Sequence, residues 1–368
     1  MQRRRFLQQA GAAAAAGTLA TPARAESLPE VKWRLQSNFP KSLDLVHGSV
    51  VDLSKHLEAM TAGRFRVEVS ANEEVVAGGQ ILDALRDGTV EACHADANSF
   101  FDRDPVFAFF GAMPFGLTPG QQEAWLRFGG GLQRLNEALK RHQVIGFPAG
   151  GTGVQMGGWF RRELKAVADL TGLKLRAGGF NAAVLAKLGA VPQRLADREV
   201  LAALGAGRID GLESTGPYDD EKQGLYKAAR YYFFPMGPGD GNQFILLVGR
   251  NAWTALPPAY RAAFGAACAA AGVELRARYD ASNPRALRTL LANGVQLRPF
   301  PQEIARAGFL AADEVYAQTL AGNDAFRQIF SEWKAFRDEQ VRAFGLAQAR
   351  VQAFIHAAVV TPAPAARK

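Results

Sequence analysis

Two segments of the chain share one pattern, and this repetition constrains the fold more than any other feature of the sequence. Residues 81–99 read ILDALRDGTVEACHADANS, and residues 200–216 read VLAALGAGRIDGLESTG. In each segment a short amphipathic stretch ends at a glycine, Gly88 or Gly207, and glycine readily takes the left-handed conformation that terminates a helix. A strand-like run follows and ends in small polar residues. The shared register predicts a structural duplication, and therefore two similar lobes with a cleft between them.

Strand-like and helix-like periodicities also alternate along the rest of the chain. The first lobe reads strand 31–39, helix 45–60, strand 65–71, helix 79–86 and strand 90–97, and a similar series returns after Gly150. Alternation of this kind predicts a parallel sheet covered by helices, so the expected fold class is α/β with two lobes. From Pro257 onward the pattern is almost entirely helical.

The boundaries of these parts follow from changes in composition. The glycine- and proline-rich stretch FPMGPGDGN interrupts the alternation and predicts a crossing between the lobes. We expect an export signal at 1–25, lobe I at 26–151 with a crossing segment at about 240–256, lobe II at 152–239, C-terminal helices at 257–360 and a disordered tail at 361–368.

The first 25 residues, MQRRRFLQQAGAAAAAGTLATPARA, have the layout of an export signal: a basic start, an alanine-rich middle and an Ala-x-Ala end. Arg3, Arg4, Phe6 and Leu7 fit the Arg-Arg-x-Phe-Leu pattern of twin-arginine export, which we favour over a general secretory signal. No later stretch has the apolar length that a membrane helix requires. We therefore expect the mature chain in the periplasm.

Charge and composition give no sign of a nucleic-acid partner. The chain is 48% apolar and 21% charged, as in ordinary globular proteins, and it is long enough for two lobes with separate cores. Its formal net charge of +8 falls to +4 without the signal, which carries four arginines and no acidic residue. Because no run of lysine and arginine follows the signal, we expect no nucleic-acid binding.

The motifs of the common enzyme classes are missing from the sequence. There is no Gly-x-Ser-x-Gly elbow, Walker loop, Cys-x-x-Cys or His-Glu-x-x-His, and the five histidines are scattered. The stretch GGTGVQMGGWF has Met156 where a dinucleotide-binding loop needs its third glycine. A binding protein is therefore favoured over an enzyme.

Polar residues follow the strand of each repeated unit. Open sheets bind ligands beyond the carboxyl ends of their strands. We therefore expect Asn98, Ser99 and Phe100 to face the cleft from lobe I. Glu213, Ser214 and Thr215 are expected to face it from lobe II.

Arg176 ends the apolar run LKLRAGG and is followed by two glycines that let a main chain or ligand approach closely. An arginine grips a carboxylate with two parallel hydrogen bonds, so an anionic ligand is one interpretation. A structural salt bridge at the strand end is the other, and the spacing leaves the two evenly balanced. Gln155 and Gln243 also stand at the edges of apolar runs.

Glu213 would repel an anionic ligand in the same cleft unless a cation lay between them. The Glu213 carboxylate, the Gln155 amide oxygen and a main-chain carbonyl are hard oxygen ligands that suit sodium or calcium. On sequence grounds alone, a helix-capping or hinge role for Glu213 is favoured over metal binding.

Several stretches resemble the solute receptors of tripartite ATP-independent periplasmic (TRAP) transporters, closest to the subgroup that binds 2-oxo acids such as pyruvate. They are SNFPKSLD, FPAGGTGVQMGGWFRRELKAVADLTGLKLRAGGF, VLAKLGAVPQ and GPYDDEK. The resemblance covers nearly all of the chain after the signal, and it implies a two-lobed periplasmic binding protein fold. It also implies that Arg176 holds the ligand carboxylate, while Gln155 and Glu213 hold a metal ion that touches the ligand.

Two departures from those receptors affect the expected site. Relatives carry tryptophan where this chain has Ser214, which still offers its main-chain carbonyl to the metal, and an aromatic cluster where it has Asn98 and Ser99. Loss of aromatic bulk admits a longer oxo acid, a hydroxy acid such as lactate, or an aromatic monocarboxylate. The expected ligand contacts are Arg176, Gln155, Asn98, Phe100 and Gln243, and the expected metal ligands are Gln155, Glu213 and Ser214.

The expected partners are a small carboxylate and the small and large membrane subunits of a TRAP permease. Two rival functions remain open at this point: a periplasmic enzyme with Glu213 as general base and a metal as Lewis acid, and a ligand-sensing subunit of a signalling system.

The C-terminal segment sets Phe326, Phe330, Trp333 and Phe336 three or four residues apart, on one face of a helix. Packing on the same chain and contact with a second subunit are equally compatible with this stripe. The segment SEWKAFRDEQ resembles that of the dimeric receptors, which implies a homodimer that exchanges its final long helix.

Overall fold

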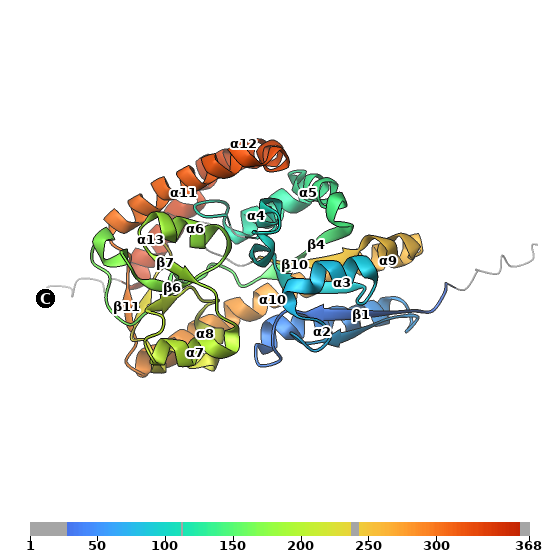
Figure 1. Ribbon diagram of the computed structural model, residues 1–368, viewed down its shortest axis with the longest axis horizontal. Coiled ribbons are helices and arrows are strands. Elements are labelled where there is room, and N and C mark those ends of the chain that lie inside the picture. Colours follow the sequence, from blue (N-terminus) through green and yellow to red (C-terminus); the bar gives the residue numbers. More distant parts are fainter. Residues whose placement is uncertain (1–27, 112, 237–242, 361–368) are drawn as a thin grey trace, which may run out of the picture.

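The chain folds around two sheets, which a computed structural model describes for residues 28–111, 113–236 and 243–360 (Figure 1). The expected export signal at 1–25 and the tail at 361–368 lie outside these residues. So does most of the FPMGPGDGN stretch, at 237–242. None of the described helices is long and apolar enough to cross a membrane.

The first sheet has five strands in the order β2-β1-β3-β10-β4. Its elements in chain order are β1 Val31–Ser37, α2 Asp44–Met60, β2 Phe65–Ser70, α3 Ile81–Asp87, β3 Ala92–Asp96, α4 Pro119–Phe128, α5 Gly131–Leu139 and β4 Val144–Gly151, with β10 Gln243–Gly249 returning later. Short 3-10 helices at Gly78–Gln80, Ala97–Phe100, Pro105–Phe109 and Lys140–His142 join them.

The second sheet has six strands in the order β11-β9-β5-β8-β6-β7. Its elements are β5 Gly158–Phe160, β6 Lys174–Arg176, α6 Gly179–Lys187, β7 Val191–Gln193, α7 Asp197–Gly205, β8 Gly211–Leu212, α8 Pro217–Gln223, β9 Tyr231–Phe233 and β11 Gln296–Arg298. Two further 3-10 helices span Val167–Leu170 and Leu225–Lys227.

One short helix and then four longer ones follow. They are α9 Arg250–Ala255, α10 Pro258–Ala292, α11 Gln302–Gly322, α12 Asp324–Leu346 and α13 Gln348–Val360. Helix α10 contacts α2 and β4 of the first lobe and α8 of the second, so one rigid element spans both. Helices α11 and α12 contact each other and run along the top of the view in Figure 1.

The prediction of parallel sheets is wrong in one respect, because each of the two sheets contains both parallel and antiparallel strand pairs. Strands β2, β1 and β3 are parallel, but β10 lies antiparallel between β3 and β4. The chain builds five of the six strands of the second sheet before β10 returns to the first sheet, where β10 runs opposite to both of its neighbours. All seven residues of β10 are buried, as expected for a continuous apolar run at the centre of a sheet.

The internal repeat corresponds to a real helix–glycine–strand unit in each lobe. Helix α3 ends at Gly88, which has a φ of +75°, and β3 follows. Helix α7 is followed by Gly207, with a φ of +71°, and then by β8. In both units the left-handed glycine turns the chain from helix into strand, as the sequence pattern predicts.

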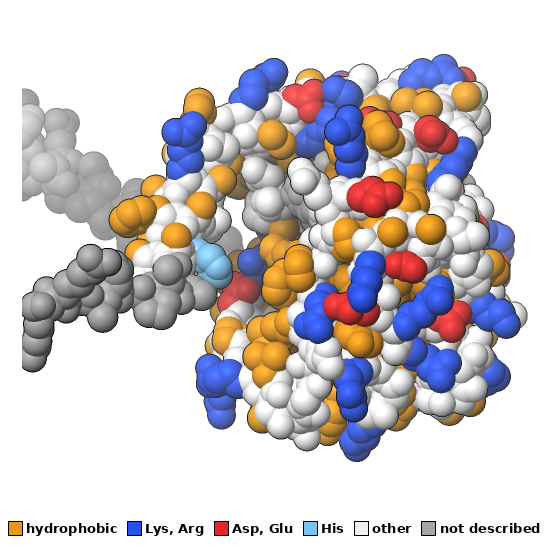
Figure 2. Space-filling view, turned by 90° about the vertical axis from the view of Figure 1, so that its left-hand side faces the viewer, with side chains coloured by type: hydrophobic (Ala, Val, Ile, Leu, Met, Phe, Trp, Pro, Cys, Tyr) orange, Lys and Arg blue, Asp and Glu red, His pale blue; other side chains and the backbone are white. Residues whose placement is uncertain are grey.

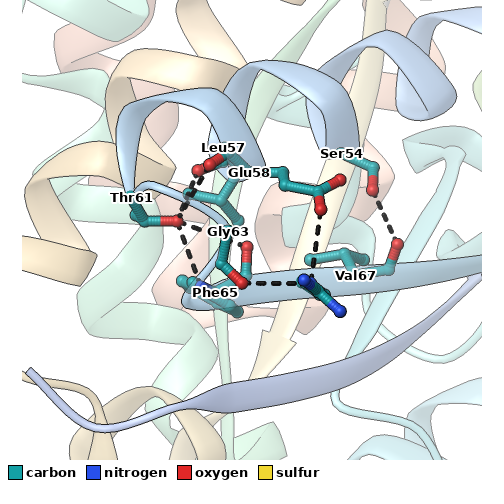
Figure 3. Close-up of polar contacts among 8 residues, drawn as sticks. Ser54, Leu57, Glu58, Thr61, Gly63, Phe65 and Val67 are labelled. Carbon is teal, nitrogen blue, oxygen red and sulfur yellow. Dashed lines mark hydrogen bonds and ion pairs between the residues drawn. The ribbon is translucent and has the colours of Figure 1, made fainter.

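The turn between α2 and β2 shows how polar contacts set the position of an edge strand (Figure 3). The Thr61 hydroxyl donates to the Leu57 carbonyl (2.7 Å) and accepts from the Phe65 N–H (3.1 Å). Two turns earlier in α2, the Ser54 hydroxyl donates to the Val67 carbonyl (2.6 Å). These bonds satisfy backbone groups at the helix end and attach β2 to α2.

The C-terminal aromatic stripe packs on its own chain. Phe326 and Trp333 are fully buried, Phe330 is nearly so, and Phe336 packs at the edge of the same core. Phe326 lies 4.6 Å, centroid to centroid, from Phe109 of the first lobe. Packing within the subunit, rather than contact with a second subunit, therefore accounts for the stripe.

An apolar surface is found farther along, on the last helices. Figure 2 shows apolar side chains on an arm that stands away from the body of the molecule. On α12 and α13 the exposed large apolar residues are Val341, Phe344, Leu346, Val351, Phe354, Ile355 and Val359. Within the described part of the chain, nothing covers this face.

Candidate functional site

A cavity of about 350 Å³ lies between the two lobes and collects polar residues from the strand ends of both. Its polar lining consists of Asp96, Asn98, Ser99, Asp102, Gln155, Arg176, Asn181, Gln193, Arg194, Glu213, Ser214 and Thr215. Its apolar lining consists of Pro114, Phe115, Met156, Ala177, Val184, Leu185, Leu195 and Met236, and three glycines complete it. This size and mixture are typical of small-molecule sites.

In the second lobe, neighbouring strands deliver Gln155, Arg176 and Glu213 to one sheet edge. Strands β6 and β8 are parallel, so Arg176 at the end of β6 and Glu213 just after β8 lie side by side. The Glu213 N–H donates to the Arg176 carbonyl at 3.1 Å. Strand β5 is antiparallel to β8, so Gln155, which precedes β5, reaches the same edge.

In the first lobe, the end of β3 supplies Asp96, Asn98 and Ser99. The Asp96 carboxylate accepts the Asn98 N–H at 2.9 Å, which caps the 3-10 helix that follows. A Cβ on Gly111 would lie 2.9 Å from the Asn98 amide, and one on Gly179 would lie 3.0 Å from the Asn98 Cβ. The two glycines thus leave the space that this side chain occupies at the meeting of the lobes.

Arg176 has a carboxylate partner within the chain. Its guanidinium donates to Asp197, the first residue of α7, at 2.7 Å, and its side chain is 34% exposed. The salt-bridge interpretation of the sequence therefore holds, and the same arginine also lines the cavity. Asp197 orients the guanidinium at the cavity wall.

Acidic groups near the cavity set its electrostatics. Burial raises the pKa of Asp96, and the Asn98 N–H and the charge of Arg176 oppose this rise. The lining contains two further acidic residues, Asp102 and Glu213. Its two cationic residues are Arg176 and Arg194. A bound anion would therefore need Arg176 or a metal cation close to it.

The donor set of the lining suits a hard cation. Gln155, Glu213 and Ser214 bring an amide, a carboxylate and a main-chain carbonyl oxygen to one cavity. Residues 28–111, 113–236 and 243–360 contain no group of three or more His, Cys, Asp or Glu that could hold a metal ion. A cation here would therefore depend on the Glu213 carboxylate together with amide, main-chain and ligand oxygens, a set that favours sodium or calcium over zinc or copper.

Two predicted ligand contacts do not line the cavity. Phe100 is buried and packs 5.1 Å from Phe107, because the 3-10 helix at Ala97–Phe100 turns its ring into the core. Gln243 is buried at the start of β10, and its amide donates to the Pro119 carbonyl at 3.3 Å. Asn98, Ser99, Gln155, Arg176, Glu213, Ser214 and Thr215 do line it.

Sequence reasoning missed four charged residues of this site: Asp96, Asp102, Arg194 and Asp197. Asp96 directly follows the strand-like run ACHA, and this position at a strand end was the available signal. Asp102 and Arg194 form an ion pair that joins the two lobes beside the cavity. The pairing of residues so far apart in the chain has no local signature.

Other polar contacts also cross from one lobe to the other. Glu73 pairs with Arg198 at 2.8 Å. Asp44, at the start of α2, contacts Lys222 of α8 at 2.5 Å and accepts the Tyr218 hydroxyl at 3.1 Å. These contacts are further direct links between the two lobes.

Most of the chain matches the sequence pattern of a single protein family. Residues 36–323 match the model of the bacterial extracellular solute-binding proteins, family 7. The chain is also 40% identical, over 345 residues, to a monocarboxylate 2-oxoacid-binding periplasmic protein of Nostoc sp.. That match covers 92% of this chain and 94% of the relative.

Solved structures show the same architecture. A TRAP transporter solute-binding protein from Bordetella bronchiseptica superimposes with a TM-score of 0.88 at 39% identity, over 90% of this chain and 99% of that one. It is described with copurified calcium and picolinate in its active site. A TRAP solute-binding protein from Pseudoalteromonas atlantica, with bound sodium and pyruvate, has a TM-score of 0.83 at 31% identity, over 88% and 99% of the two chains.

Proposed function

Because the chain belongs to family 7 of the bacterial extracellular solute-binding proteins, we propose that it is the receptor of a TRAP transporter that binds a small monocarboxylate together with a metal ion. The family consists of solute-binding proteins, so the metal-assisted enzyme is disfavoured. A receptor holds its ligand between the lobes and releases it unchanged to the membrane subunits.

The proposed ligands carry a metal-binding atom next to the carboxylate. Pyruvate and picolinate, found in the two structural relatives, share this feature: a keto oxygen in one and a ring nitrogen in the other. Such a pair of donors can grip one cation. We therefore propose a 2-oxo acid such as pyruvate, or a 2-hydroxy acid such as lactate, as the solute.

The proposed roles follow from the layout of the cavity. Arg176 holds the carboxylate of the solute, and Asn98 contacts its other end from lobe I. Gln155, Glu213 and the main-chain carbonyl of Ser214 hold sodium or calcium. The metal, when bound, supplies positive charge between Glu213 and the anionic solute, which offsets their mutual repulsion.

One observation carries this proposal: the hydrogen bond from the Glu213 N–H to the Arg176 carbonyl. This bond supports the proposed roles because it holds Arg176 and Glu213 next to each other, at the ends of adjacent strands that line the cavity. Neighbouring strands lie roughly 4.8 Å apart, a separation that a metal–carboxylate unit can bridge.

Titration calorimetry with pyruvate and lactate, in sodium, in calcium and in chelator, tests these roles. Arg176→Lys should weaken binding at least about thirtyfold although the charge is kept, because lysine cannot make the two-pronged contact. Glu213→Gln should instead raise the cation concentration needed for tight binding. Wild-type affinity in Arg176→Lys would contradict the arginine role, and affinity unaffected by ion removal would contradict the metal role.

The remaining assignments are also proposals. We propose that residues 1–25 direct the chain to the periplasm by twin-arginine export, and that the small and large TRAP membrane subunits receive the solute. We propose lobe I at 26–151 with a crossing at about 240–256, lobe II at 152–239 and C-terminal helices at 257–360. The uncovered apolar face of α12 and α13 supports a homodimer, in which a second copy covers it.

A further inference from the structure

One buried carboxylate, that of Asp220 on α8, collects an unusual number of hydrogen bonds. It is fully buried and accepts from the Trp159 indole N–H (2.9 Å), the Tyr232 hydroxyl (2.5 Å) and the Ser214 hydroxyl (2.8 Å). The Gly216 N–H adds a longer contact of 3.4 Å. Several donors around one buried acid offset its loss of hydration.

The donors come from two kinds of element. Trp159 of β5 and Tyr232 of β9 are fully buried and stack at 4.1 Å, so they belong to the rigid centre of the second sheet. Ser214 and Gly216 belong to residues 213–216, which connect β8 to α8 and include two of the proposed metal ligands. Asp220 therefore attaches the metal-binding segment to the sheet.

The preceding residue offers a natural comparison. Asp219 is also fully buried on α8, but its carboxylate accepts the Tyr279 hydroxyl of α10 at 2.7 Å. No hydrogen bond from residues 213–216 to the Asp219 side chain is found in the described chain. Two adjacent buried acids thus face different elements, and only one of them contacts the metal-binding segment.

We propose that Asp220 is a positioning residue for the cation site, acting through Ser214 and Gly216 to hold the Glu213 carboxylate and the Ser214 carbonyl in place. This inference rests on the proposed function. A hard cation accepts its oxygen ligands within a narrow range of distances, so a mobile segment would bind it weakly. Loss of a group that orients metal ligands commonly costs ten- to a hundredfold in metal affinity.

The test uses two disrupting variants and two matched controls. Asp220→Asn replaces one acceptor oxygen by an NH2 group, so the side chain can no longer accept both from the Gly216 N–H and from the other three donors. Ser214→Ala removes only the hydroxyl of a half-buried residue. Asp219→Asn makes the same chemical change one residue away, and Tyr279→Phe removes the hydroxyl that donates to Asp219. Thermal unfolding in chelator checks that each variant is folded.

Two measurements are made on the full-length mature protein. Calorimetry with calcium in the presence of pyruvate should show affinity lowered tenfold or more in Asp220→Asn, lowered in Ser214→Ala, and within about twofold of wild type in the controls. Hydrogen exchange in calcium-free, pyruvate-free protein should show faster exchange of the backbone amides of 213–216 only in the two disrupting variants.

The possible results distinguish failure of the proposed function from failure of the proposed role of Asp220. Failure of the wild-type protein to bind pyruvate with either calcium or sodium would overturn the proposed function. Wild-type calcium binding that persists unchanged in both disrupting variants, with unaltered exchange at 213–216, would overturn the role of Asp220 alone. If Asp220→Asn does not fold, Ser214→Ala decides by the same two measurements.

Discussion

Replacing Asp219 by asparagine should change how the stability of the protein depends on pH. Burial raises the pKa of Asp219 to about 7, from 3.8 in an exposed carboxyl. The charges of Asp220 and Asp44 also contribute to this rise, while the hydrogen bond from Tyr279 and the charge of Lys222 oppose it. One of the two carboxylate oxygens has no hydrogen-bond partner among the described residues, so ionisation is poorly compensated.

The direction in which pH changes the stability follows from the number of protons bound by the folded and unfolded states. Between pH 4 and 7 the folded state keeps a proton on Asp219 that the unfolded state has released. The free energy of unfolding therefore falls as pH rises through this range and levels off above the folded pKa. With 1.36 kcal/mol per pKa unit, the loss between pH 5 and pH 8 is about 2 to 3 kcal/mol. An asparagine side chain at this position has no such proton to lose.

Urea unfolding of wild type and Asp219→Asn at pH 5, 6, 7 and 8 measures this. The wild type should lose about 2 to 3 kcal/mol relative to the variant between pH 5 and 8. Buried titrating groups that do not contact Asp219, such as His94, are present in both proteins and largely cancel from the difference. Asp313→Asn, which removes an exposed carboxylate on α11, controls for the change in net charge. A stability difference that stays constant across this pH range would refute the reasoning.

Two further predictions concern packing and assembly. Gly272→Ala on α10 should destabilise the fold by about 1 to 3 kcal/mol, because the new Cβ would lie 2.9 Å from the Gly150 nitrogen. Gly265→Ala on the same helix has nothing within 4 Å of the new Cβ and should be neutral or stabilising by up to about 1 kcal/mol; equal effects in urea unfolding would argue against the close contact. Removal of residues 347–368 should convert a dimer into a monomer by light scattering, and a monomeric intact protein at micromolar concentration would contradict the proposed assembly.

Local patterns in the sequence predicted much of the architecture. The alternation of apolar residues in FRVEVS and the helical spacing of Val46, Val50, Leu53 and Leu57 depend only on which face of an element is buried. The repeat ending at Gly88 and Gly207 likewise depends on one local backbone conformation. Because strand ends meet at one edge of a sheet, the same patterns also placed Arg176 and Glu213 at a common cleft.

The sequence by itself therefore determined the α/β class, the duplicated units and seven of the twelve polar residues that line the cavity, since these follow from periodicity and from the chemistry of residues at strand ends. Tertiary structure alone decided that β10 enters its sheet antiparallel, that the ring of Phe100 turns into the core, and that Asp197 engages Arg176. It also decided that Asp220 faces the segment at 213–216 while its neighbour faces α10. Such choices depend on which distant elements pack together, and that is set by burial summed over the whole molecule rather than by any short stretch of chain.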